Sequence, residues 1–202
     1  METLAKLDLR LNFPVTRSSR KSPSLFAMTD EVRAADPFPL IERLPKGAAL
    51  IFRHYAHPSR AELAARVVSA SRQAGLRCLI AGDAEIARKC GADGLHLPEY
   101  QVLQPRYFGF RPKNWLITGA AHTVKSMRRA EKLGLDAVLI SPVFPTASHP
   151  GGKALGLMNF ARLCHDTTAP VIALGGINSE QARRLRLAGA AGLAGISLFS
   201  AP

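Results

Sequence analysis

Short apolar runs recur along the chain at nearly regular intervals, and longer stretches with helical periodicity separate them. Each run holds four or five residues, which is too short for a helix and typical of a strand that is buried on both faces. Strands are therefore predicted at residues 25–28, 48–52, 77–81, 94–97, 115–119, 137–141, 170–174 and 192–196.

The stretches between these runs predict helices. Within residues 61–68, apolar side chains recur three and four positions apart, as on one face of a helix. The segment 99–113 is harder to interpret because two prolines and a glycine interrupt it. Helices are predicted at residues 37–44, 59–74, 83–90, 123–133, 157–165 and 178–188.

Glycines mark where several of these helices should end. Gly75, Gly91, Gly134 and Gly189 each stand at the end of a helical pattern and shortly before an apolar run, where a left-handed residue is needed. Eight strands alternating with helices predict a single (β/α)8 TIM barrel. A doubly wound open sheet is the alternative, but it would favour a glycine-rich turn after the first strand, where Thr29-Asp30-Glu31 stands.

The chain divides into an N-terminal extension, residues 1–24, and the barrel, residues 25–202. Residues 14–24 are a polar linker, and apolar residues alternate over Leu7–Phe13 as in a half-buried strand. Only a few residues follow the last predicted strand, so we expect a shortened or missing eighth helix. The Leu7–Phe13 segment, or a second subunit in a homo-oligomer, would then cover the apolar faces left open.

Composition limits the class of protein. The chain has 202 residues, 47% of them hydrophobic, which suits one domain with a large core. No apolar run approaches the roughly 20 residues of a membrane span, and polar residues interrupt the N-terminus where a signal peptide would be apolar. Three scattered cysteines without CxxC spacing predict reduced thiols and a cytoplasmic location.

The formal net charge of +12 favours anionic partners. Basic residues are not interleaved with aromatic ones, and aromatics make up only 6% of the chain, so small anionic substrates are a better interpretation than nucleic acid. A merely soluble basic surface would explain the charge equally well.

Two glycine turns near the C-terminus predict a phosphate site. Gly175-Gly176 follows one predicted strand, and Gly195-Ile196-Ser197 follows the next. Backbone N–H groups at such strand-to-helix turns bind phosphate, and the last two βα units of a barrel often supply them. The alternative is that these glycines only make tight turns.

Several motifs, taken in order, resemble the thiamine phosphate synthase superfamily, which also holds the TenI-type thiazole tautomerases. The resemblance covers residues 25–199 and implies the same (β/α)8 barrel. Its motifs are Leu25-Phe-Ala-Met-Thr-Asp30, Gly91-Ala-Asp-Gly-Leu-His-Leu97, Asp136-Ala-Val-Leu-Ile-Ser-Pro-Val-Phe-Pro-Thr146, Ala173-Leu-Gly-Gly-Ile177 and Gly189-Ala-Ala-Gly-Leu-Ala-Gly-Ile-Ser197.

The resemblance implies a phosphorylated thiazole as the partner. The family's phosphate-loop lysine is His149 here, and the nearby Lys153 is expected to supply the charge. The expected substrate- and phosphate-binding residues are Arg53, Thr146, Ser148, Lys153, Gly175, Gly176, Gly195, Ile196 and Ser197.

The same resemblance implies that the magnesium side of the synthase site is altered. An Asn-Asp pair of the family is Ala81-Gly82 here, and Gln101 replaces a second carboxylate. We therefore expect no cofactor. If the chain is a synthase, Mg²⁺ would need relocated ligands, of which Asp83 and Glu99 are the candidates.

A thiazole tautomerase needs no magnesium, and the resemblance implies a histidine shortly after the fifth strand as its acid/base residue. That residue is His122, whose ordinary pKa suits proton transfer. A TenI-like tautomerase is the preferred hypothesis. A synthase with altered Mg²⁺ ligands and a non-catalytic protein that binds a thiamine intermediate are the alternatives.

Other histidines carry weaker hypotheses. His96 lies within a predicted strand and is expected to be a hydrogen-bonded core residue. His54 and His57 have the spacing of metal ligands but lack clear partners, so a metal site is not predicted there.

Overall fold

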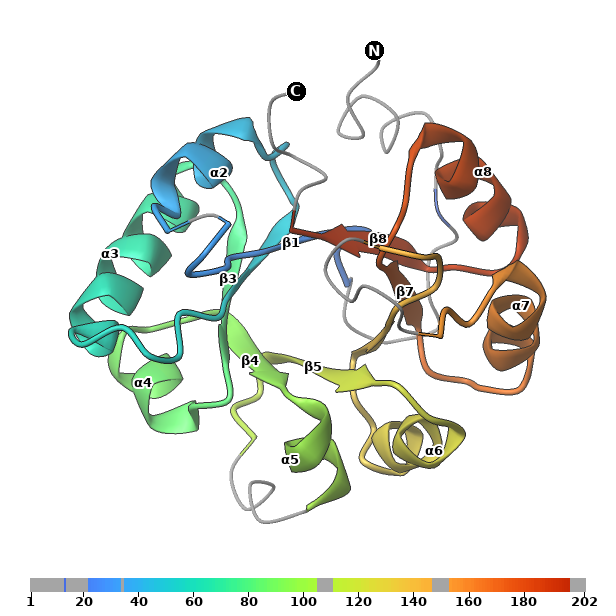
Figure 1. The fold of residues 1–202 in the computed structure, drawn as a ribbon. Coiled ribbons are helices and arrows are strands. Elements are labelled where there is room, and N and C mark those ends of the chain that lie inside the picture. Colours follow the sequence, from blue (N-terminus) through green and yellow to red (C-terminus); the bar gives the residue numbers. More distant parts are fainter. Residues whose placement is uncertain (1–12, 14–21, 34, 105–110, 147–152, 197–202) are drawn as a thin grey trace.

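The computed structural model describes residues 13, 22–33, 35–104, 111–146 and 153–196. Eight parallel strands follow one another around a closed barrel, with helices on its outside (Figure 1). The predicted barrel is confirmed, and the open-sheet alternative is wrong because the first and last strands pair with each other.

The strands are β1(Leu25–Met28), β2(Ala49–Phe52), β3(Arg77–Ala81), β4(Gly94–Leu97), β5(Leu116–Ala121), β6(Ala137–Ile140), β7(Val171–Leu174) and β8(Gly192–Gly195). The helices between them are α2(Phe38–Arg43), α3(Arg60–Gln73), α4(Ala84–Lys89), α5(Glu99–Leu103), α6(Val124–Lys132), α7(Leu157–His165) and α8(Ser179–Leu187). The predicted bounds agree to within two residues, and the uninterpreted segment 99–113 holds the short α5.

Side chains alternate between two cores, which explains why most of the strands are apolar along nearly their whole length. On β1, Phe26 and Met28 belong to a cluster inside the barrel, whereas Leu25 and Ala27 belong to the layer between strands and helices. Successive residues of a strand point to opposite faces, so burying both faces requires an unbroken apolar run.

The four glycines predicted to end helices all have positive φ, between 61° and 94°. After α3, for example, the chain turns at Gly75 back toward β3, and a side chain would be strained in this left-handed conformation.

Two aspartates join neighbouring strands at their N-terminal ends. The Asp93 carboxylate, just before β4, accepts a 2.8 Å hydrogen bond from the N–H of Cys78 on β3. Asp136, just before β6, accepts a 2.7 Å bond from the N–H of Ile117 on β5 and pairs with Arg111 at 2.7 Å. Both lie at the end of the barrel opposite to the usual active sites, so we assign them to stability.

We expect Asp136→Ala to lower the free energy of unfolding by about 2–4 kcal/mol, because it leaves the Ile117 N–H and the Arg111 guanidinium without their shared acceptor. Urea denaturation measures the loss. Asp166→Ala is the control: its side chain is 56% exposed beside Arg162, so its removal should cost less than about 1 kcal/mol. Equal losses in the two variants would contradict the assignment.

Of the Leu7–Phe13 segment, the structure describes Phe13 alone. Phe13 is 9% exposed and belongs to the outer core. Leu7, Leu9 and Leu11 lie outside the described residues. Residues 197–202 also lie outside the described residues. The expectation of a shortened or missing helix after the last strand concerns these residues. Among the helices described, none has both the length and the apolar character needed to cross a bilayer.

Candidate active site at the carboxyl ends of the strands

A cavity of about 260 Å³ opens at the carboxyl ends of the strands. Active sites of (β/α)8 barrels lie at this end. Residues from the ends of most strands form its wall: Met28, Arg53, His96, Ala120, Ser141, Leu174 and Ile196, with Arg33, Tyr55 and Pro98 from the loops and Glu99 from the start of α5.

Five of the predicted site residues line this cavity, namely Arg53, His122, Thr146, Gly175 and Ile196. Because β7 and β8 are neighbours in the barrel, Gly175 and Ile196 reach the same cavity from the two predicted phosphate turns.

The other predicted residues lie elsewhere. Lys153 lines a neighbouring cavity of about 470 Å³, which shares His122, Ser141 and Pro142 with the first. Gly176 and Gly195 adjoin residues of the main cavity without lining it themselves. Ser148 and Ser197 lie outside the described residues.

The Gly175-Gly176 turn packs tightly against the loop that follows β6. Its two residues have φ of 97° and 66°, and a Cβ on Gly176 would collide with the carbonyl oxygen of Pro145. The N–H of Phe144 donates to the Gly175 carbonyl at 3.2 Å. The glycines are therefore required by local packing, whatever they bind.

His122 is held in one orientation. Its ring Nδ1 lies 2.6 Å from the carbonyl oxygen of Ser141, and its backbone N–H donates to Glu99 Oε1 at 2.8 Å. A carbonyl oxygen can only accept, so Nδ1 carries the proton and Nε2 of the neutral ring keeps a free lone pair. A ring held in this way can accept a proton at Nε2.

Glu99 is held as a carboxylate next to this histidine. Burial raises its pKa, but hydrogen bonds from the Ser126 side chain and the His122 N–H, together with the positive charge that the His122 ring carries when it is protonated, bring the pKa below its usual value. The site therefore has a negative group on the side of the cavity next to α6.

His96 is buried and its Nδ1 lies 2.9 Å from the Thr118 hydroxyl, as expected for a core histidine. It also lines the cavity, which its position within a strand did not indicate. Burial, and then the charge of Arg53, lower its pKa from 6.5 to about 3, so the ring is neutral at neutral pH.

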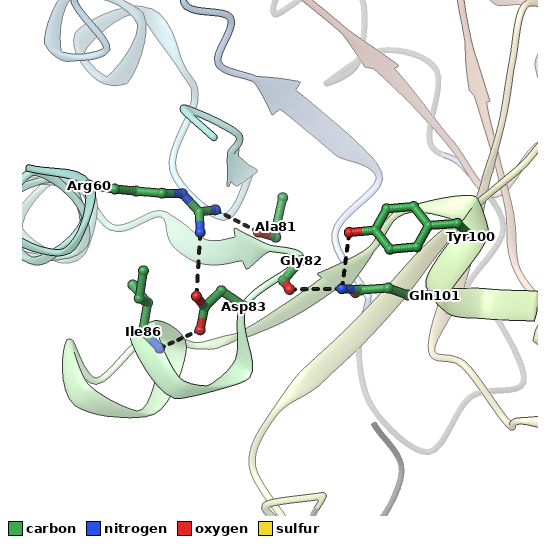
Figure 2. A network of polar contacts seen from close by, with 7 residues as sticks. All are labelled: Arg60, Ala81, Gly82, Asp83, Ile86, Tyr100 and Gln101. Atoms are coloured by element: carbon green, nitrogen blue, oxygen red, sulfur yellow. Dashed lines mark hydrogen bonds and ion pairs between the residues drawn. The ribbon is translucent and has the colours of Figure 1, made fainter. Parts of the chain in front are cut away.

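The carboxyl end of β3 is closed by a polar network (Figure 2). Arg60 Nη2 donates to the carbonyl of Ala81 at 2.6 Å, and Nη1 lies 3.7 Å from the Asp83 carboxylate. Asp83 also accepts the N–H of Ile86 and so caps α4. The buried Gln101 donates to the carbonyl of Gly82 at 2.9 Å.

These residues do not fit the Mg²⁺ of the synthase alternative. Asp83 is turned toward Arg60, whose positive charge opposes a second cation, and Glu99 already accepts the His122 N–H. In the part of the chain that the structure describes, no group of three or more His, Cys, Asp or Glu side chains could hold a metal ion.

His54 and His57 likewise form no metal site. Both ring nitrogens of His54 are engaged, Nδ1 with the Thr29 hydroxyl at 2.9 Å and Nε2 with the Ala35 carbonyl at 3.0 Å.

A closed parallel barrel with ionisable residues around a cavity at its carboxyl end defines the (β/α)8 class. Within that class, the chain belongs to the thiamine monophosphate synthase family, whose family model matches residues 26–199.

Individual relatives agree with this family. The "Putative thiamine-phosphate synthase 2" of Aquifex aeolicus is 34% identical over 88% of this chain and 97% of its own length. The thiamine-phosphate synthase of Bacillus velezensis is 29% identical, over 87% and 82% respectively. A solved structure, the thiamine phosphate pyrophosphorylase of Pyrococcus furiosus, aligns with a TM-score of 0.68 and 26% identity over 86% of this chain and 85% of that one. These names favour the synthase alternative over the tautomerase that the sequence analysis preferred.

We expect the buried neutral His96 to make the protein sensitive to acid. Between about pH 6.5 and 3 the unfolded chain protonates this histidine and the folded protein does not, so stability is lost as the pH falls through this range. The loss approaches about 1.4 kcal/mol for each pH unit.

His96→Asn should remove this contribution while leaving an amide beside Thr118. Urea denaturation at pH 7, 6, 5 and 4 should show the wild type losing stability more steeply than the variant. Parallel curves would mean that His96 is protonated in the folded protein.

Proposed function

We propose that the cavity binds a phosphorylated thiazole and that the chain acts on it as an enzyme of thiamine biosynthesis. One observation carries this proposal: the ends of β7 and β8 face the same cavity as Arg33, Arg53 and His122. Arginine pairs well with phosphate, and backbone N–H groups at these strand ends are the usual phosphate ligands of the fold.

The first candidate reaction is that of the synthase, because full-length relatives carry this name. The thiazole nitrogen would attack the methylene carbon of an aminopyrimidine pyrophosphate. A C–N bond forms, the C–O bond breaks, and pyrophosphate leaves with the electron pair. Among the described residues, Arg33 and Arg53 line the cavity and could stabilise the leaving charge.

The second candidate is the tautomerase, and the orientation of His122 favours it. With Nδ1–H bonded to Ser141, Nε2 could take a proton from one ring atom and return it to another. This reaction needs no metal, in keeping with the engagement of Asp83 and Glu99 by other groups.

One assay separates the candidates. The purified full chain is mixed with thiazole phosphate and aminopyrimidine pyrophosphate, with Mg²⁺ or with EDTA, and thiamine phosphate is measured. Product formed in both conditions is the result expected for a synthase that relies on its arginines. Product formed only with Mg²⁺ would show that the carboxylates rearrange around the metal.

If no thiamine phosphate forms, binding of thiazole phosphate is measured by calorimetry and tautomerisation by absorbance. Binding with turnover supports the tautomerase. Binding without turnover supports the non-catalytic alternative, and no binding of thiazole phosphate contradicts the proposed function.

His122→Asn keeps the size of a polar side chain but cannot exchange a proton. If His122 is the acid/base residue, the variant should bind thiazole phosphate nearly as well as the wild type and slow tautomerisation by roughly 10²–10⁴-fold. His165→Asn, at an exposed position on α7, is the matched control and should change neither quantity. A variant with weaker binding and unchanged turnover would make His122 a binding residue.

A further inference from the structure

His54 is a buried histidine that does not line the cavity, yet it bridges two segments that do. It is the second residue after β2, is 1% exposed, and stacks on Phe52 with ring centroids 5.0 Å apart and an angle of 6° between the planes. Nδ1 lies 2.9 Å from the Thr29 hydroxyl, and Nε2 lies 3.0 Å from the Ala35 carbonyl oxygen. The imidazole thus contacts both ends of the loop that joins β1 to α2.

The protons of this bridge can be assigned. The Ala35 carbonyl only accepts, so in the neutral ring Nε2 carries the proton and Nδ1 accepts from the Thr29 hydroxyl. The Thr29 oxygen in turn accepts the backbone N–H of Arg53 at 2.8 Å. A continuous series of hydrogen bonds therefore runs from the backbone of Arg53 through Thr29 and His54 to Ala35.

Each end of this series of hydrogen bonds lies at or near an arginine that lines the cavity. Arg53 is the first residue after β2, and Arg33 lies in the loop between Thr29 and Ala35; each lines the cavity. Within the loop, the Asp30 carboxylate accepts the N–H groups of Val32 and Arg33 at 3.1 and 3.0 Å.

Further contacts hold residues 30–33 of this loop in place. Burial raises the pKa of Asp30, but these N–H groups and the charges of Arg33 and Arg53 bring it below its usual value, so the carboxylate persists. Glu31 accepts the N–H of Ala56 at 2.9 Å. Hydrogen bonds thus order residues 30–33 and join Glu31 to the segment after β2, and His54 joins Ala35 to that same segment.

We propose that His54 is a positioning residue that holds Arg33 and Arg53 together at the cavity for an anionic ligand. A purely packing role would need only an apolar ring against Phe52, but both imidazole nitrogens are used. That the ligand is a phosphorylated thiazole rests on the proposed function. That His54 positions the loop does not rest on it.

Two amide substitutions separate the two arms of the bridge. In His54→Asn the amide lies near the place of Nδ1 and can keep the bond to Thr29, whereas in His54→Gln it lies near the place of Nε2 and can keep the bond to Ala35. His54→Leu removes both bonds, and His57→Asn, three residues further on, is the matched control.

The first measurement needs no ligand. Limited digestion with trypsin, followed by mass spectrometry, gives the rate of cleavage after Arg33. We expect this rate to rise at least threefold in His54→Asn and His54→Leu and to stay near the wild-type value in His54→Gln and His57→Asn. Cleavage as slow in both His54→Asn and His54→Leu as in the wild type would overturn the proposal. If His54→Leu does not fold, the comparison of His54→Asn with His54→Gln decides alone.

The second measurement is the affinity for inorganic phosphate by calorimetry. We expect about a tenfold loss in His54→Leu, a smaller loss in each amide variant and none in His57→Asn. Unchanged affinity in His54→Leu and both amide variants would overturn the coupling to the arginines. A wild type that binds neither phosphate nor thiazole phosphate would contradict the proposed function, and the trypsin experiment would then decide on the loop alone.

Discussion

Closure of the barrel between β1 and β8 is the constraint on which the rest of the structure depends. Phe26 pairs with Ala194 and Ala27 with Gly195, so the backbone groups of both end strands find partners and no sheet edge is left. Closure also brings the carboxyl ends of strands that are far apart in the sequence around one cavity. Without it, Arg53 after β2 and Ile196 after β8 would not face the same space.

The fold was predictable because its signals are local. The strands are buried on two faces and are therefore mostly apolar, and glycines such as Gly75 mark where helices end. The strand-joining carboxylates of Asp93 and Asp136 were not predicted. Each accepts a hydrogen bond from a strand about 15 or 20 residues earlier in the chain, and such a contact cannot be predicted from the spacing of apolar residues.

The site was predictable in part, for the same reason. Arg53, His122 and Gly175 directly follow strands, and parallel strands bring such positions together. Arg33 and His96 also line the cavity and were not predicted to do so. Arg33 lies in the middle of a loop, and the periodicity of a strand does not tell a residue that lines the cavity, such as His96, from one buried in the core. The surroundings of Asp83 and Lys153 were harder to predict. Asp83 pairs with Arg60 and Lys153 lines the neighbouring cavity, and neither partner nor cavity can be deduced from distance along the sequence.

The polar network at β3 explains how a member of the family can differ from the synthase pattern without losing the barrel. Arg60, from α3, satisfies the Ala81 carbonyl and pairs with Asp83, while Gln101 satisfies Gly82 (Figure 2). Polar backbone groups at the end of a buried strand need such partners. The side chains of Arg60 and Gln101 thus satisfy the backbone carbonyls at this strand end, whatever chemistry the cavity retains.

The two kinds of charge around the cavity lie on separate arcs of the barrel. Arg33 and Arg53 follow β1 and β2, and closure makes β1 a neighbour of β8, whereas the Glu99 carboxylate stands after β4 and beside the loop following β5. Opposite charges attract and like charges repel most strongly where water is displaced. This distribution favours an anionic ligand whose charged group lies toward the ends of β1 and β2 and whose uncharged part lies toward Glu99 and His122.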